Sequence, residues 1–261
     1  MYCLEDKLRK KYGERFDIFA PEFLERVRDL DEVRRRRCRI QEYPAGPELV
    51  SKHASPVRLY YLLDSSAIIH LYVPDENLTP KLDHLIEQRG LGKAFLLIPN
   101  FCVAETFNAL ARMHYRKKEL DAELYQLCKE TFGRDIHNGQ FFYHYEMNRY
   151  HILDVDHIIP YEHLFLTQRP QGARRGEDWS LSTYDVLIIA MGMELDRITG
   201  GAVHVVTCDR RMDAIGKILV HLSREQREKY HVPNFVQFPR TINLWKTDLE
   251  EFPFVEGQRV G

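Results

Sequence analysis

The chain has 261 residues, 44% of them apolar, which is the composition of a packed globular protein with one large domain or a domain and an appendage. Its 37 basic residues nearly balance 39 acidic ones, and the net charge of -2 argues against a uniformly basic nucleic-acid-binding surface. Five scattered cysteines without C-x-x-C pairs argue against a disulfide framework and a structural zinc site. With no signal-like start and no apolar run near the ~20 residues that span a bilayer, we expect a cytoplasmic protein without membrane contact.

Residues 1–56 are dominated by charge and contain the run Arg34-Arg35-Arg36-Arg37. Apolar residues recur at near-helical spacing between Phe16 and Leu30, which predicts an amphipathic helix in part of this stretch. The breaker-rich residues 43–47 mark a boundary. We interpret residues 1–56 as a partly helical N-terminal extension, whose arginine run is either a solvated helix face, a face for an acidic partner, or a contact for RNA.

From residue 57 onward, short apolar runs alternate with helical patterns. The predicted buried strands are Arg58–Leu63, Ala94–Ile98 and Val203–Thr207. The predicted helices are Ser65–Tyr72, Phe101–Arg116, Tyr184–Leu195 and Arg210–Leu219. This alternation predicts one α/β domain over residues 57–261, with a three-layer Rossmann-like fold and a central, mostly parallel sheet flanked by helices.

A long and less regular segment, residues 119–180, interrupts the alternation. It opens with a helical pattern at Glu119–Glu130 and continues through the aromatic stretch Phe141–Tyr145, which favours packing over base stacking. It closes in the polar loop Arg169–Asp178. Near the C-terminus, Phe235–Trp245 is split by a proline and predicts an edge strand or two short ones.

Four acids occupy related places in this pattern. Asp64 ends the first predicted strand and Asp209 ends the third. Glu105 lies in the opening turns of one helix, and Asp185 opens another. In a parallel sheet all four would project toward the edge formed by the carboxyl ends of the strands, where ligands of such sheets collect.

Each acid also has a structural explanation. Ser182-Thr183-Tyr184-Asp185 is a capping-box sequence, Asp209 stands where an N-cap is expected, and Asp64 could be an N-cap too. Taken singly, Asp185 and Asp209 are better explained by capping. Glu105 is harder to explain this way, because its helix face with Phe101, Ala104, Asn108 and Ala111 is largely apolar and a buried unpaired carboxylate is costly.

Four acids brought together repel one another unless a cation neutralises them. Oxygen ligands without Cys or His at zinc spacing select hard ions, so the expected cofactor is Mg2+ or Mn2+. Such an ion lowers the pKa of bound water and clamps phosphodiester oxygens. The sequence therefore predicts hydrolytic nuclease chemistry.

At these residues the chain resembles the PIN-domain family, in order, spacing and flanking apolar runs: Asp64 before Ser65 and Ser66, Glu105 in Val-Ala-Glu, Asp185 in Asp-x-x-Ile-x-Ala, and Asp209 in Thr-Cys-Asp. The match covers roughly residues 58–240. The resemblance implies a metal-dependent endoribonuclease, in which Asp64, Asp185 and Asp209 hold metal and Glu105 holds metal or orients the attacking water. It also implies Ser66 as a substrate- or water-positioning residue.

Asp213, one turn past Asp209, is a further metal candidate, although an exposed helical acid beside Arg210 is usually solvated. For substrate phosphates the candidates are Arg210 and the loop residues Arg174 and Arg175, since that loop ends about ten residues before Asp185. Expected partners are an RNA substrate, an antitoxin or other protein, and a second copy of the chain. The long N-terminal extension and the long middle segment depart from compact toxins of the family.

Three other functions compete. A non-catalytic PIN-like RNA-binding or assembly module would usually have lost one or more acids, and none is lost here. An aspartate phosphatase would have a second Asp two residues after the first, whereas Asp64 precedes Ser65-Ser66-Ala67. A flap-type DNA nuclease would need more acids at the site and a helical motif that binds DNA, and we find neither in the sequence.

Overall fold

The computed structural model describes residues 59–90, 93–138, 141–160, 162, 180–199 and 203–253. The N-terminal extension and the loop residues Arg174 and Arg175 lie outside the described residues. Within them, no helix combines the length and the apolar character needed to cross a membrane.

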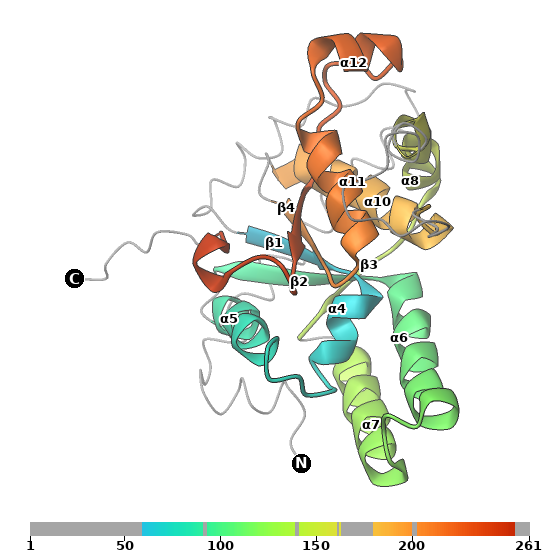
Figure 1. The fold of residues 1–261 in the computed structure, drawn as a ribbon, viewed down its shortest axis with the longest axis vertical. Helices are drawn as coiled ribbons and strands as arrows, with labels where there is room; N and C mark the ends of the chain where they lie inside the picture. The colour runs from blue at the N-terminus through green and yellow to red at the C-terminus, as the bar shows by residue number, and fades with distance from the viewer. Residues whose placement is uncertain are drawn as a thin grey trace, which may run out of the picture.

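Five parallel strands form one sheet in the order β3-β2-β1-β4-β5 (Figure 1). Their bounds are β1 Leu59–Leu63, β2 Ala94–Pro99, β3 Tyr143–Tyr145, β4 Val203–Thr207 and β5 Arg240–Asn243. Every residue of β1, β2 and β4 is buried, which explains why β1 and β2 are unbroken apolar runs and why β4 is largely apolar, with the buried polar residues His204 and Thr207. The predicted α/β fold with a parallel central sheet is confirmed.

Helices cover both faces of the sheet (Figure 1). One side carries α4 Ser65–His70, α5 Thr79–Gly90, α6 Asn100–Arg112, the π-helical turn η1 Met113–Lys117 and α7 Ala122–Asn138. The other carries α8 Arg149–Asp154, the turn η2 Val155–His157, α10 Thr183–Thr199 and α11 Arg210–Val220, as right-handed crossovers require. Two short elements follow, α12 Arg224–Lys229 and η3 Leu249–Glu251.

The chain reverses its direction across the sheet at β1. It runs outward from β1 through β2 to β3, then returns through α10 to place β4 on the other side of β1 and β5 at the edge. Registers pair Leu63 with Val206, and Thr207 with Asn243, so the strand ends lie in one row. The crevice between the carboxyl ends of β1 and β4 is therefore the position that such sheets use for ligands.

Some boundaries differ from the predictions. The helix predicted through Arg116 is α-helical only to Arg112 and then widens into the π-helical turn η1. The aromatic stretch packs as expected, since Phe141 and Phe142 are fully buried beside β3. The C-terminal strand forms only after the proline, as the edge strand β5. Helix α5 was not predicted, because its pattern is polar and its apolar stripe is narrow.

Candidate functional site

Asp64 lies at the centre of the candidate site. It follows β1 directly, and its backbone amide donates to the carbonyl of Val206 at 2.9 Å, so the pairing of β1 with β4 fixes its position. The residue is 4% exposed. Asp64 occupies the N-cap position of α4, as the sequence suggested, but its carboxylate makes no capping hydrogen bond to the helix. The carboxylate therefore belongs to the site and not to the helix terminus.

Two hydroxyl groups hold this carboxylate. The Thr207 hydroxyl donates to Asp64 Oδ2 at 2.9 Å and accepts the backbone amide of Asp209 at 2.9 Å. The Ser66 hydroxyl also donates to Asp64, and it accepts the amide of Cys208 at 2.9 Å. Burial raises the pKa of Asp64, and the bonds from Ser66 and Thr207 offset only part of that effect. The hydroxyls thus tie the ends of β1 and β4 together around one carboxylate.

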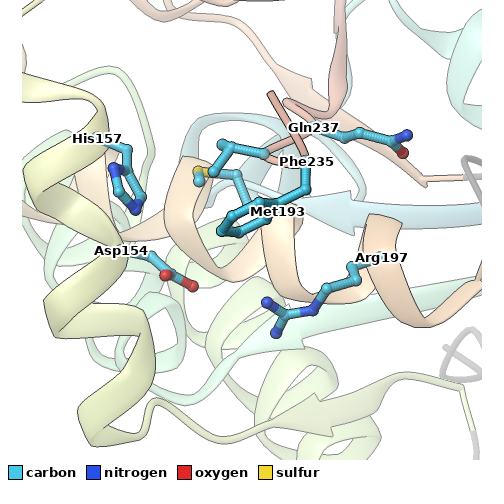
Figure 2. Close-up of a pocket in the computed structure, with 7 residues that line it drawn as sticks. Asp154, His157, Met193, Arg197, Phe235 and Gln237 are labelled. Atoms are coloured by element: carbon cyan, nitrogen blue, oxygen red, sulfur yellow. The ribbon is translucent and has the colours of Figure 1, made fainter. Parts of the chain in front are cut away.

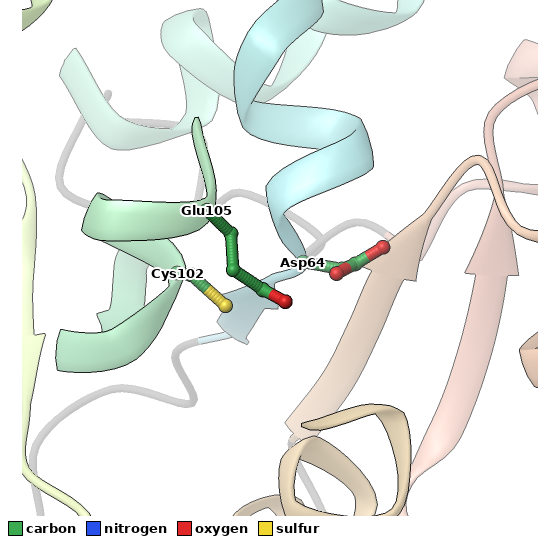
Figure 3. Close-up of side chains that lie close together, drawn as sticks. All are labelled: Asp64, Cys102 and Glu105. Carbon is green, nitrogen blue, oxygen red and sulfur yellow. The ribbon is translucent and has the colours of Figure 1, made fainter. Parts of the chain in front are cut away.

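Glu105 reaches the same place from α6, with Cys102 one turn before it. Ligand atoms of Asp64, Cys102 and Glu105 all lie within 4.8 Å of one another, and the three side chains converge from two elements (Figure 3). Burial, and then the charge of Asp64, raise the pKa of Glu105, while hydrogen bonds from Ser65 and Cys102 lower it. Burial, and then the charges of Asp64 and Glu105, raise the pKa of the Cys102 thiol well above its usual value, and sulfur is a softer ligand than Mg2+ or Mn2+ prefers.

The helix face that carries Glu105 differs from the expected one. The buried residues of α6 are Cys102, Thr106 and Leu110, whereas Ala104 and Asn108 are exposed. Glu105 stands between the two faces and is partly buried. The expected apolar face is therefore found only in part, because Ala104 and Asn108 are exposed while Phe101 and Ala111 are partly buried.

Asp185 opens α10 and is both a cap and a member of the cluster. Its carboxylate accepts the Ser182 amide at 2.8 Å, and its own amide donates to the Ser182 hydroxyl at 3.2 Å, which confirms the predicted capping box. Burial raises the pKa of Asp185, and the negative charges of Asp64 and Asp209 raise it further. The carboxylates therefore repel one another across the crevice.

Asp209 differs from the other three because a cation already holds it. It is the N-cap of α11 and accepts the Arg211 amide at 2.6 Å, as predicted for a cap. The Arg211 guanidinium also binds its carboxylate, with the closest contact at 2.6 Å, and donates to the Ser180 carbonyl at 3.1 Å. Burial opposes ionisation of Asp209, but the hydrogen bonds and charge of Arg211 outweigh it and lower the pKa.

Asp213 is not the exposed acid that its sequence context suggested. It is 1% exposed and forms ion pairs with Lys217 at 3.1 Å and Lys246 at 3.5 Å. The residue faces β5 because one turn of α11 carries it inward, behind Asp209. Arg210, one turn earlier, is exposed at the rim of the site.

The donor set fits a hard divalent cation in part. Asp64, Glu105 and Asp185 offer carboxylate oxygens whose raised pKa values reflect burial and mutual repulsion, which a bound cation would relieve. Asp209 fits less simply, since an ion would share this carboxylate with Arg211 or displace the guanidinium. The three remaining acids are therefore the principal candidate ligands.

Within the described residues, one surface hollow and one small cavity lie near the helices and strands that carry the acids. One, of about 580 Å³, borders Asp209 and is lined by Cys208, Asp209, Arg210, Arg211, Asn243, Trp245 and Lys246. The other is a cavity of about 20 Å³ beside Met193 and Arg197 of α10 (Figure 2). Met193 lies roughly 12 Å further along the helix than Asp185. That cavity has room for about one water and is too small for a substrate.

Four site residues were not predicted from the sequence: Cys102, Thr207, Arg211 and Trp245. Cys102 lies within a predicted helix and Thr207 ends a predicted strand. Both come close to Asp64 only because elements distant in the sequence pack together. A signal existed for Arg211, since an arginine in the first turn after an acidic N-cap can fold back onto it.

The parallel sheet, its crevice and the carboxylates at its edge define a three-layer α/β protein of the kind expected from the PIN-domain resemblance. Among solved structures, the chain is similar to VapBC2 from Rickettsia felis, crystallised with a DNA fragment from its promoter, at 10% identity and a TM-score of 0.37 over 60% of this chain and 93% of that chain. It is also similar to PAE2754 from Pyrobaculum aerophilum, at 17% identity and a TM-score of 0.35 over 60% of this chain and 84% of that one. No protein-family model matches the sequence, and no curated protein matches it.

Proposed function

We propose that this chain is a metal-dependent endoribonuclease that hydrolyses RNA phosphodiester bonds at the cluster of Asp64, Glu105, Asp185 and Asp209. The observation that carries the proposal is the convergence of these acids on the crevice between β1 and β4, with raised pKa values in three of them. A protein retains such mutual repulsion where a ligand compensates it. Mg2+ or Mn2+ matches an all-carboxylate donor set.

When bound, the ion would supply Lewis acidity toward the phosphate and a lowered pKa for the attacking water. Asp64 and Asp185 are proposed as its main ligands. Ser66 and Thr207 both donate to Asp64 Oδ2, which orients the carboxylate, while Oδ1 has only the longer contact from the Ser65 hydroxyl at 3.4 Å among the hydroxyl groups. For Glu105, which is partly exposed and has a raised pKa, we propose that it orients the water and accepts its proton.

Arg210 at the rim is proposed to bind substrate phosphate, and the same role is proposed for Arg174 and Arg175, which lie outside the described residues. Ser66 directs its hydroxyl to Asp64 and the Cys208 amide, so a direct contact with substrate remains a prediction. An antitoxin or other protein partner, self-association, a cytoplasmic location and a toxin role also remain predictions.

The test is cleavage of fluorescent single-stranded and hairpin RNAs with Mn2+, Mg2+ or EDTA. Asp64→Asn and Asp209→Asn are compared with the wild type and with Asp83→Asn, which makes the same chemical change at an exposed position of α5. We expect metal-dependent cutting that both site variants lower by about a hundredfold or more, the range for losing one group that stabilises the transition state. Asp83→Asn should cut like the wild type.

A non-catalytic RNA-binding module is the second candidate, and the contact between Arg211 and Asp209 favours it, because the protein itself neutralises one of the four acids. Equal cutting by wild type and both site variants, or no cutting with any ion while RNA is still bound, would support the module and contradict the nuclease.

A further inference from the structure

The hollow beside Asp209 has the size and position of a substrate-binding subsite. Its volume of about 580 Å³ falls within the roughly 300–1,000 Å³ of small-molecule sites. It lies past the ends of β4 and β5, so it adjoins the carboxylate crevice on the side away from Glu105. A polymer held across the crevice would extend one of its units into this hollow.

Its floor is held rigidly by the buried side chain of Asn243. The amide group donates to the Asp209 carbonyl at 3.2 Å and accepts the Trp245 backbone amide at 3.0 Å. The backbone carbonyl of Asn243 in turn accepts hydrogen bonds from the backbone amides of Lys246 at 3.1 Å and Thr247 at 2.8 Å. One fully buried residue therefore fixes the turn that carries Trp245 against the loop that carries Asp209.

A second element clamps the same turn. Lys81 of α5 donates to the Leu244 carbonyl at 2.7 Å, and the Leu244 amide donates to the Thr207 carbonyl at 3.0 Å. The turn is thus tied to both the sheet and a helix. Such a preorganised surface loses little conformational entropy when it binds a ligand.

Trp245 offers an aromatic surface on this fixed turn. The residue is 46% exposed, although its backbone is held by two elements. The His70 ring packs against the indole at 86° with ring centroids 5.8 Å apart, and much of the indole stays exposed. An exposed indole on a fixed turn, next to the proposed cleavage site, is suited to stack a nucleobase.

Cations on the hollow outnumber its acids. Arg210, Arg211 and Lys246 line it against the single carboxylate of Asp209. Lys246 shares the buried Asp213 with Lys217, so that acid is already balanced by a second lysine. The hollow therefore presents net positive charge beside an aromatic ring, the combination with which proteins bind single-stranded nucleic acid.

We propose that this hollow binds one nucleotide of single-stranded RNA adjoining the scissile phosphate, with its base stacked on Trp245 and its phosphate near Arg210 and Lys246. The identification of the polymer as RNA rests on the proposed function. The binding surface itself rests on the hollow, the indole and the charge.

The chain contains only two tryptophans, Trp179 and Trp245, which allows a direct optical test. In a Trp179→Phe, Asp64→Asn background with EDTA, Trp245 is the sole indole and the RNA stays uncut. Short single-stranded oligo(A) and oligo(U) RNAs are titrated, and the indole fluorescence and the anisotropy of labelled RNA are recorded. We expect quenching of Trp245 on binding, strongest with oligo(A), whose purine has the larger stacking surface.

By anisotropy, Trp245→Ala should weaken binding about 5- to 150-fold, the range for loss of one stacked base, and Trp245→Phe should retain most of the affinity. Tyr115→Ala is the matched control, since this aromatic is 61% exposed and lies on η1, beyond the far end of α6 from the site. Binding that is unchanged in Trp245→Ala, or that leaves the indole unquenched, overturns the proposal.

The same variants separate this proposal from the nuclease proposal. Quenching and Trp245-dependent binding in a protein that cuts no RNA would support the hollow and reject the catalytic function. Metal-dependent cutting that is identical in wild type and Trp245→Ala, with equal affinity, would support the nuclease and reject the hollow. Equal quenching by single-stranded DNA would keep the stacking site and reject its specificity for RNA.

Discussion

Thr207→Val should separate the positioning of the acids from their chemistry. Valine keeps the shape and strand preference of threonine at this fully buried position, so the change removes little more than a hydroxyl group. That hydroxyl donates to Asp64 and accepts the Asp209 amide, both at 2.9 Å. A hydrogen bond to a carboxylate contributes about 1.5–3 kcal/mol and one from an amide about 0.5–1.5 kcal/mol. Loss of both should therefore lower the unfolding free energy by about 2–4 kcal/mol.

The same substitution should weaken metal binding. The Thr207 bond lowers the pKa of Asp64, so its removal raises that pKa further and makes the carboxylate harder to ionise. Urea denaturation gives the stability, and Mn2+ titration calorimetry gives the affinity. Thr207→Ser, which keeps the hydroxyl, should stay close to wild type in affinity. A Thr207→Val protein as stable as the wild type, or a Thr207→Ser protein as impaired as Thr207→Val, would refute the reasoning.

Two further substitutions test charged groups, one at the opposite edge of the sheet from the site and one within it. Burial raises the pKa of Asp196 from 3.8 to about 6, so its folding contribution is greatest in acid and is lost as pH rises, by about 3 kcal/mol above pH 6. Asp196→Asn should therefore flatten the pH dependence of urea stability between pH 4 and 8 by about 2–3 kcal/mol, and an unchanged slope would contradict the buried-charge argument. Arg211→Ala removes the cation that pairs with Asp209, and we expect a loss of about 1 kcal/mol in unfolding free energy, because the pair is partly exposed. Calorimetry should show severalfold tighter Mn2+ binding, because Asp209 becomes available to the ion. Weaker or unchanged binding would contradict competition between Arg211 and the ion for Asp209.

The order of elements was predictable because it depends on local patterns. Buried parallel strands are continuous apolar runs, so β1, β2 and β4 were predicted to within a residue or two, and acids directly after two of them had to lie at one edge of a parallel sheet. The caps at Asp185 and Asp209 were predictable for a related reason, since capping bonds join residues two or three apart.

The sequence by itself determined the fold class and the edge of the sheet at which the acids lie, since both follow from periodicity and from where strands end. Only the tertiary structure decided the surroundings of those carboxylates. The Thr207 bond to Asp64 spans 143 positions, and the burial of Asp213 depends on lysines from α11 and from the turn after β5. Trp245 borders Asp209 only because β5 pairs beside β4. Contacts of this kind depend on which elements pack together, and local patterns carry no information about that choice.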